Sequence, residues 1–392
     1  MRKLRSMGCW VGALLVSCGG GSEDETSESP SPPTPDLSTP TPVTPHPATD
    51  TPSASVSPTA LPGTPDASTP TPGTPVPATP TAVDSTPIPE GGTILKPELL
   101  GPNLLGATLT TCTLADGSQS TCWELLFGAN PIDEGPYCPD TIDDIGGLGA
   151  YDGQTNPGFQ AMKADLWNAM EADGYDIVDP NGNIRVADPA DPIDQSYSYC
   201  LEGSPNDELV LTFLIPEIPK LLSSPDAIET VEFFGVSVDG VPMNGPPPSV
   251  VSGPPGGGGP PQKITAKGGG NIPAIDRCGG HQDPSGYYHW HLIPESANDL
   301  FDAIGLDDFI CTAMEQGDGL LSGYARDGYP IYTATDVNGT LPDNLDACSG
   351  HTGVTTDYPG GIYHYHALPD TAPNVVPCIV GVAASKPFEH PQ

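Results

Sequence analysis

A pattern of cysteine, glycine, histidine and aromatic residues occurs twice in this 392-residue chain and constrains its fold more than any other feature. The first copy comprises Cys278–His281 and Gly286–Glu295, and the second comprises Cys348–His351 and Gly361–Asp370. Both read Cys-x-Gly-His, then Gly-x-Tyr-His-aromatic-His-x-x-Pro-acid, and another cysteine follows each copy. Agreement at this many positions predicts an internal duplication.

The histidine pairs of the two copies have the spacing of strand residues that point the same way. Side chains alternate between the faces of a β-strand. His289 and His291 should therefore share one face, with Tyr288 and Trp290 on the other. The second copy repeats this arrangement with His364 and His366 against Tyr363 and Tyr365.

These segments resemble the YHYH protein family, named for the tetrapeptide that stands here at residues 363–366. The first copy departs from the tetrapeptide at Trp290. Residues 323–332, Gly-Tyr-Ala-Arg-Asp-Gly-Tyr-Pro-Ile-Tyr, and residues 234–241 are similar to two further motifs of the family. The resemblance covers roughly residues 205–380 and implies a domain, but family membership does not define a biochemical activity.

Six of the eight histidines lie in the two copies, which predicts a metal or ligand site. Imidazole ligands without thiolates suit copper, zinc, iron or nickel, and we expect copper or zinc here. The predicted ligands are His281, His289, His291, His351, His364 and His366. The carboxylates expected to support them are Asp327, Glu295 and Asp370. One site shared about a pseudo-dyad and two separate sites are both open, as is a structural role for the histidines.

The cysteines predict disulfides, because their number is even outside the N-terminal segment and no Cys-x-x-Cys pair occurs. The repeat suggests a symmetric pairing of Cys278 with Cys311 and of Cys348 with Cys378. The remaining pairs would be Cys112 with Cys122 and Cys138 with Cys200. Eight cysteines permit about 105 complete pairings, so the sequence leaves other connectivities open.

The N-terminus predicts export and lipidation. Residues 1–17 have the basic start and short apolar run of a signal peptide. Leu15-Val16-Ser17-Cys18 resembles a bacterial lipobox, so we expect Cys18 to carry the lipid anchor. We therefore expect an extracytoplasmic protein of the cell envelope. The absence of Asp after Cys18 favours the outer membrane or cell surface over the inner membrane.

Composition divides the rest of the chain. Residues 18–95 are rich in Pro, Thr and Ser, which predicts a disordered stalk behind the lipidated cysteine. Residues 96–204 form the N-terminal part of the globular region, and residues 205–392 form the YHYH domain. The net charge of −38 excludes nucleic acid as a partner and leaves the lipid anchor as the only membrane contact.

We predict a β-rich α+β fold stabilised by disulfides. Strands are expected at residues 107–114, 120–127, 209–215, 231–238 and 328–333, with helices at 158–173 and within 297–315. Residues 179–183 and 336–340 come nearest to a calcium-binding loop, but both are explained as Asn-Gly turns.

Three functions remain open. The preferred one is an envelope lipoprotein that binds a transition metal through the repeat histidines. The second is a metal-dependent envelope enzyme, either a hydrolase or an oxidoreductase, for which no catalytic residue can be named. The third is a surface protein that binds an envelope partner without metal and whose histidines belong to the core.

Overall fold

The computed structural model describes residues 94–132, 134–252 and 270–391. Within these ranges the fold is β-rich, with twenty strands, two α-helices and two short 3-10 helices. The predicted signal peptide, the lipobox and nearly all of the stalk lie outside the described residues. None of the described helices is long and apolar enough to cross a membrane.

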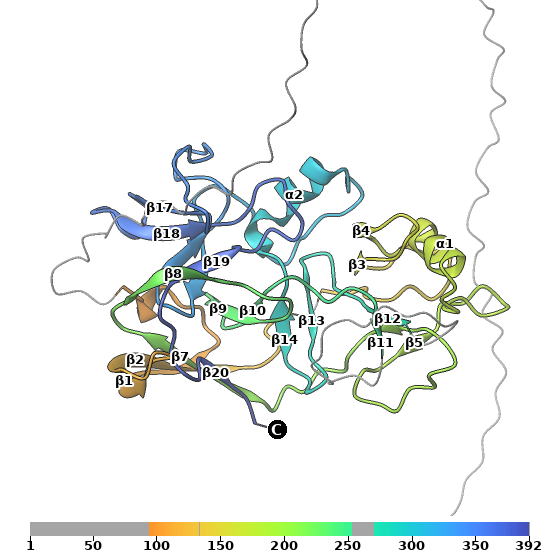
Figure 1. Cartoon of the computed structure of the whole chain (residues 1–392), viewed down its shortest axis with the longest axis horizontal. Helices are drawn as coiled ribbons and strands as arrows, with labels where there is room; N and C mark the ends of the chain where they lie inside the picture. The colour runs from red at the N-terminus through yellow and green to blue at the C-terminus, as the bar shows by residue number, and fades with distance from the viewer. Residues whose placement is uncertain (1–93, 133, 253–269, 392) are drawn as a thin grey trace, which may run out of the picture. The chain divides into compact units, whose positions relative to one another are not determined.

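An eight-stranded sheet contains the strands β13, β14, β17 and β18, which come from the two copies of the pattern (Figure 1). Its strand order is β13-β14-β10-β9-β15-β16-β18-β17. The bounds, in the same order, are Gly280–Gln282, Tyr288–Trp290, Pro242–Asn244, Phe233–Ser237, Leu321–Ala325, Pro330–Tyr332, Ile362–His366 and Gly350–Gly353. The histidine-bearing strands therefore lie at opposite ends of the sheet.

The pairing pattern of this sheet is the same on either side of its centre. Strands β9 and β15 are antiparallel, with Val236 opposite Tyr324 at the middle. Outward from there, each central strand forms an antiparallel hairpin with β10 or β16. Each hairpin then pairs in parallel with β14 or β18. The outermost strand is antiparallel on both sides and sets His281 opposite His289 and His351 opposite His364.

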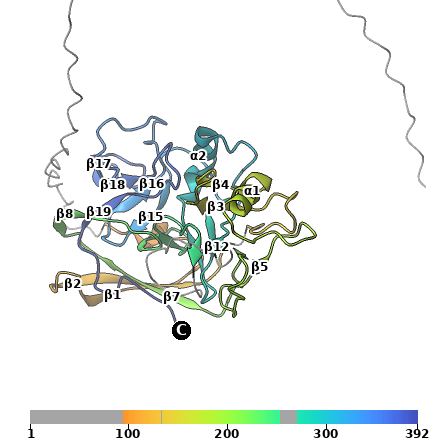
Figure 2. The same ribbon diagram turned by 45° about the vertical axis from the view of Figure 1, so that its right-hand side comes forward.

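A second sheet packs against the central strands (Figure 2). Its order is β1-β2-β7-β20, with bounds Leu104–Thr113, Gln119–Gly128, Val210–Pro216 and Phe388–Glu389. The contact is apolar, because Phe127 and Phe213 share one buried cluster with Val236 and Tyr324. Strand β2 pairs along its length with β7, so this sheet joins residues on both sides of position 204.

The remaining elements form smaller units. Strands β5, β6, β11 and β12 make a four-stranded sheet, β3 pairs with β4, and β8 pairs with β19. Their bounds are Val186–Ala187, Cys200–Leu201, Val251–Ser252, Gly270–Pro273, Leu148–Tyr151, Gly158–Ala161, Leu221–Ala227 and Cys378–Gly381. The helices are α1 at Ala164–Ala172, α2 at Ala297–Ile304, and the 3-10 helices Pro97–Leu99 and Pro294–Ser296.

The helix predicted at 158–173 is wrong over its first six residues and correct from Ala164 to Ala172. Residues 158–161 form strand β4, which pairs with β3, and α1 begins only at Ala164. Pairing with β3 therefore overrides the helical spacing of Phe159. From Leu166 to Met170 the apolar face is buried in a local core. At the other helix, Gly305 ends α2 in the left-handed conformation, as its position predicts.

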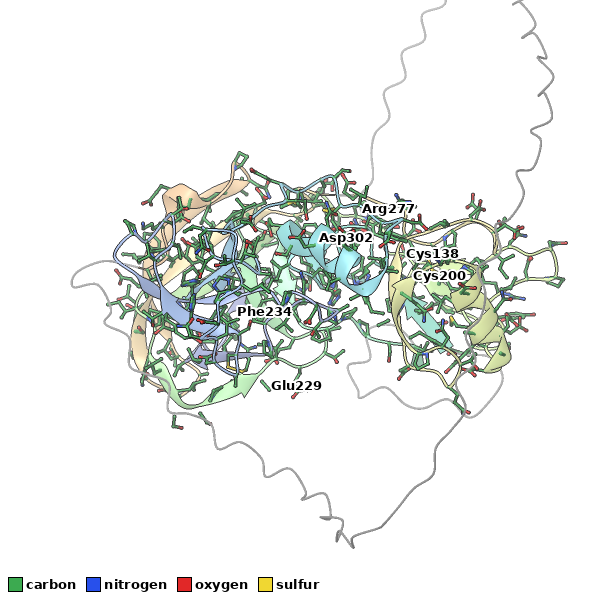
Figure 3. All side chains as sticks on the ribbon, turned by 90° about the horizontal axis from the view of Figure 1, so that it is seen from above. Cys138, Cys200, Glu229, Phe234, Arg277 and Asp302 are labelled. Carbon is green, nitrogen blue, oxygen red and sulfur yellow. A yellow bond between two sulfur atoms is a disulfide. The ribbon has the colours of Figure 1, made fainter. Side chains whose placement is uncertain are left out.

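Four disulfides are present among the described residues, and they join the predicted pairs. Cys278 is bonded to Cys311, Cys348 to Cys378 and Cys112 to Cys122. Cys138 is bonded to Cys200, as Figure 3 shows. Cys278 and Cys348 each precede the first histidine of their copy by three residues. The two repeat disulfides therefore hold the chain just before a histidine strand.

Removing the Cys348–Cys378 bond should lower the free energy of unfolding. The bond spans 30 residues, and a loop of this size stabilises by about 3.6 kcal/mol in the chain-entropy account. We expect denaturant titration to show that loss for Cys348→Ser/Cys378→Ser. The control, Cys112→Ser/Cys122→Ser, spans 10 residues, and its entropic loss should be about 1 kcal/mol smaller. A Cys348/Cys378 variant as stable as the parent would contradict this.

Candidate metal centres

An aspartate, buried in the first copy and half-buried in the second, shapes the turn that precedes the first histidine of each copy. Asp276 Oδ1 accepts hydrogen bonds from the backbone N–H groups of Cys278, Gly279 and Gly280 at 2.8, 2.8 and 3.1 Å. Its other oxygen accepts from the Tyr288 hydroxyl at 2.5 Å. The carboxylate thus fixes the turn to strand β14, which carries the histidine pair.

Asp346 forms the corresponding hydrogen bonds in the second copy. It accepts from the N–H groups of Cys348 and Gly350 at 2.8 and 3.0 Å and from the Tyr363 hydroxyl at 2.8 Å. Neither aspartate was among the predicted site residues. The signal was present, because an aspartate stands two residues before the cysteine in both copies.

Strand alternation places the histidines and aromatic residues as predicted. Tyr288 and Trp290 of β14 are fully buried and belong to the main hydrophobic core. His289 and His291 point the other way, with their Nε2 atoms 3.1 Å apart. The aromatic face thus anchors each strand, while the opposite face presents imidazoles.

The first cluster consists of His281, His289 and His291. His291 Nε2 lies 3.1 Å from His289 Nε2 and 3.2 Å from His281 Nε2. All three imidazoles come from one copy of the pattern, with His281 on β13, His289 on the adjacent strand β14 and His291 directly after β14. The three donor atoms lie within 4.8 Å of one another, a distance that one metal ion can bridge.

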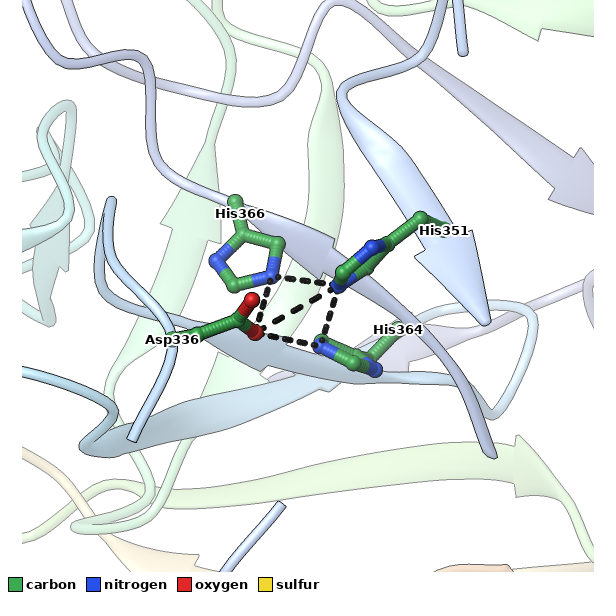
Figure 4. A group of neighbouring side chains, drawn as sticks. All are labelled: Asp336, His351, His364 and His366. Carbon is green, nitrogen blue, oxygen red and sulfur yellow. Dashed lines mark hydrogen bonds and ion pairs between the residues drawn. The ribbon is translucent and has the colours of Figure 1, made fainter. Parts of the chain in front are cut away.

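The second cluster consists of His351, His364 and His366, and Asp336 joins it (Figure 4). His351 Nε2 lies 3.1 Å from His364 Nε2 and 3.2 Å from His366 Nε2. Asp336 Oδ1 lies 3.5, 3.9 and 3.8 Å from the Nε2 atoms of His351, His364 and His366, respectively. This cluster therefore offers three nitrogens and one carboxylate oxygen to a common centre.

Hydrogen bonds at Nδ1 determine which ring nitrogen holds the proton. A backbone carbonyl can only accept, so Nδ1 must donate to it. His281 donates to the Ala274 carbonyl at 2.8 Å and His291 to the Gly245 carbonyl at 2.6 Å. In the second cluster, His366 donates to the Thr333 carbonyl at 2.7 Å and His364 to the Ile362 carbonyl at 3.0 Å. When these rings are neutral, Nε2 keeps a free lone pair.

Burial keeps these rings neutral. It lowers the pKa of His281 to about 4 and that of His291 to about 3. The pKa of His289 also lies well below its ordinary value. In the second cluster, burial lowers the pKa of His364 to about 3 and also lowers that of His366. Near pH 7 these five imidazoles are therefore in the form that binds metal.

The converging nitrogens have the spacing of ligands around one ion. Within the second cluster, and between His281 and His291 in the first, both Nε2 atoms carry lone pairs, so these neutral rings cannot form hydrogen bonds with each other. Bonds of about 2.0–2.1 Å to a tetrahedral zinc would put the nitrogens about 3.3 Å apart. The observed contacts of 3.1 and 3.2 Å are close to that spacing in both clusters.

The histidines form two clusters and not one. Strands β14 and β18 are separated in the sheet by β10, β9, β15 and β16. At about 4.8 Å per strand, the two histidine strands lie roughly 24 Å apart. The arrangement in which four imidazoles converge about a pseudo-dyad is therefore not the one observed.

The three supporting carboxylates predicted from the sequence lie elsewhere. Asp327 accepts from the Tyr365 hydroxyl at 2.7 Å and from the Gly381 N–H at 2.8 Å, on the aromatic side of β18. Asp370 is exposed and accepts a hydrogen bond from Thr371. Glu295 is buried, with no hydrogen-bond partner for either carboxylate oxygen among the described residues. The structure brings none of the three into a histidine cluster.

Asp336 is the ligand candidate that the sequence prediction missed. It stands at the start of the segment 336–340, which was explained as an Asn-Gly turn. The turn exists, with the Thr340 carbonyl accepting from the Asp336 N–H and the Asp336 carbonyl accepting from the Gly339 N–H. Asp336 follows Thr333 by three residues, and the Thr333 carbonyl accepts a hydrogen bond from His366. This places the Asp336 carboxylate beside the cluster. No local pattern distinguishes this turn from the one at Asp179.

The pKa of Glu295 predicts a pH-dependent stability. Burial raises the pKa of this carboxyl from 4.5 to about 7. Below pH 4.5 it is protonated in both states, but between pH 4.5 and 7 it ionises in the unfolded chain and stays neutral at its buried site. The folded state should lose about 3 kcal/mol through this group over that range. We expect Glu295→Gln to remove this loss.

Urea titrations at pH 5 and pH 8 measure the effect. The difference in unfolding free energy between Glu295→Gln and the parent should shift in favour of the variant at pH 8. Asp370→Asn, at an exposed site, is the matched control and should follow the parent. An unchanged pH dependence in Glu295→Gln would contradict the assignment.

The comparison with protein-family models agrees with the sequence motifs. The model described as "YHYH protein" matches residues 212–341. The match includes the first histidine cluster and Asp336, and it ends before His351. Comparisons with curated proteins and with solved structures found no match. The chain therefore contains a domain of the YHYH protein family, from strand β7 to the loop that follows Asp336.

Proposed function

We propose that this protein binds transition-metal ions at the two histidine clusters, one ion in each. The observation that carries the proposal is the convergence of Nε2 atoms at 3.1–3.2 Å in both clusters, with five of the six rings hydrogen-bonded through Nδ1. Imidazole donors without thiolates favour zinc or copper. The backbone carbonyls at Nδ1 provide the orienting bonds that metal-bound histidines usually have.

The proposed setting is the bacterial cell envelope, with Cys18 lipidated and the stalk spacing the domain from the membrane. The lipobox sequence supports the anchor, and four disulfides suit an oxidising compartment. The outer membrane or cell surface is the preferred location. Binding of metal there would serve its capture, delivery or use.

We also propose that the two clusters descend from one duplicated unit. The matched pairing pattern on either side of β9 and β15 supports this. In both halves the last histidine donates to a carbonyl just past the inner hairpin, Gly245 in one and Thr333 in the other. Both halves also have the aspartate turn before the cysteine.

Elemental analysis tests the proposal. The full chain, produced with its disulfides formed and without a polyhistidine tag, should contain about two equivalents of zinc or copper after reconstitution. Replacing His289 and His291 by Ala, or His364 and His366 by Ala, should each remove about one equivalent. His390→Ala, which alters a histidine outside both clusters, is the control and should keep both. A folded parent that binds no metal would overturn the proposal.

Metal should also stabilise the fold. An ion that binds only the folded state at 100 times its Kd adds about 2.7 kcal/mol per site to the free energy of unfolding. We therefore expect zinc to raise the thermal midpoint and a chelator to reverse this. In the variant lacking His364 and His366, zinc should increase the free energy of unfolding by about half as much as it does in the parent. If zinc stabilised the parent and a variant lacking both histidine pairs equally, zinc would be binding outside the two clusters.

A further inference from the structure

The two clusters differ in charge, although their histidines are arranged alike. The second contains Asp336, whose oxygen lies 3.5–3.9 Å from all three Nε2 atoms. The first offers three neutral imidazoles, and in the described part of the chain no carboxylate joins them as Asp336 joins the others. A divalent ion would keep a net charge of +2 in the first cluster and +1 in the second.

Sequence position explains the difference. Asp336 stands three residues after Thr333, whose carbonyl holds His366. In the first half, Gly245 holds His291 in the same manner, and three residues further on stands Pro248. The proline side chain has no atom that can bind a metal ion. Residues 245–275 contain no His, Cys, Asp or Glu at all, so the sequence supplies no carboxylate in this stretch.

Burial makes the missing negative charge important. His289 and His291 are 4% and 0% exposed, so a divalent ion held by them would have little water around it. An uncompensated charge in such surroundings is costly, and an anion bound directly to the metal lowers that cost. Three histidines around an ion also leave a fourth tetrahedral position free.

We propose that the first cluster takes a small exogenous anion as its fourth ligand, whereas Asp336 occupies that position in the second. This inference rests on the proposed metal binding. Hydroxide fills the position when no other anion is present, through loss of one proton from a bound water to the solvent. The ligand class is a small monovalent anion that binds the metal through one atom. The fourth ligand of the metal can therefore exchange in the first cluster, whereas in the second cluster the protein itself supplies it.

Among the described residues, the C-terminal tail brings a further histidine towards the first cluster. The ring of His390 lies 4.8 Å from that of Tyr287, which lies 5.6 Å from the ring of His289. Tyr287 therefore stands between the tail and the cluster. If His390 reached the metal instead, anion binding would appear only after His390→Ala, and the proposal would be wrong.

Cobalt(II) and azide provide the test on the full chain. Cobalt is loaded to two equivalents, and azide is titrated while the visible absorption of the metal is followed. We expect one azide per chain in the parent and in His364→Ala/His366→Ala, and none in His289→Ala/His291→Ala. Asp336→Ala should raise the number of azides bound per cobalt in the second cluster from zero to one. Asp370→Ala should bind one azide, as the parent does.

Cobalt content and near-ultraviolet circular dichroism are measured first for each protein. Absence of cobalt from the folded parent would overturn the metal-binding proposal itself. Two bound cobalt ions with no azide response, or an azide response that survives His289→Ala/His291→Ala, would overturn only the present inference. If that double variant does not fold, His281→Gln replaces it, and retention of parental azide binding there has the same meaning.

Discussion

The candidate metal centres depend on where one proton sits on each imidazole. A carbonyl oxygen at Nδ1 requires the proton to be there, and the lone pair then points from Nε2 towards the neighbouring rings. The carbonyls of Ala274 and Gly245 impose this on His281 and His291 of the first cluster, and those of Thr333 and Ile362 impose it on His366 and His364 of the second. Without these bonds, the rings could rotate or exchange tautomers and hydrogen-bond to one another.

The rest of the domain holds those rings in place. Short strands alone would not fix an imidazole, but Trp290 and Tyr365 are fully buried on the opposite face of their strands. The aspartate turns and the two repeat disulfides hold the chain before each cluster. The histidines are thus positioned by rigid elements on every side, which is what a preorganised metal site requires.

Much of this arrangement could be predicted from the sequence, because it is local. Strand alternation predicts that His289 and His291 share a face, and the position of each cysteine within the pattern suggests its disulfide partner. The separation into two clusters could not be predicted, since it depends on the order of strands in the sheet. The role of Asp336 depends on a contact between a turn and a distant strand, for which an Asn-Gly turn carries no signal.

X-ray absorption spectroscopy at the zinc edge of the metal-loaded chain tests the central claim most directly. If the imidazoles bind the ion through Nε2, the first shell should contain nitrogen and oxygen at about 2.0–2.1 Å, with the outer-shell scattering of several imidazole rings. A sulfur shell near 2.3 Å, or a light-atom shell without imidazole scattering, would contradict the assignment of these histidines as ligands.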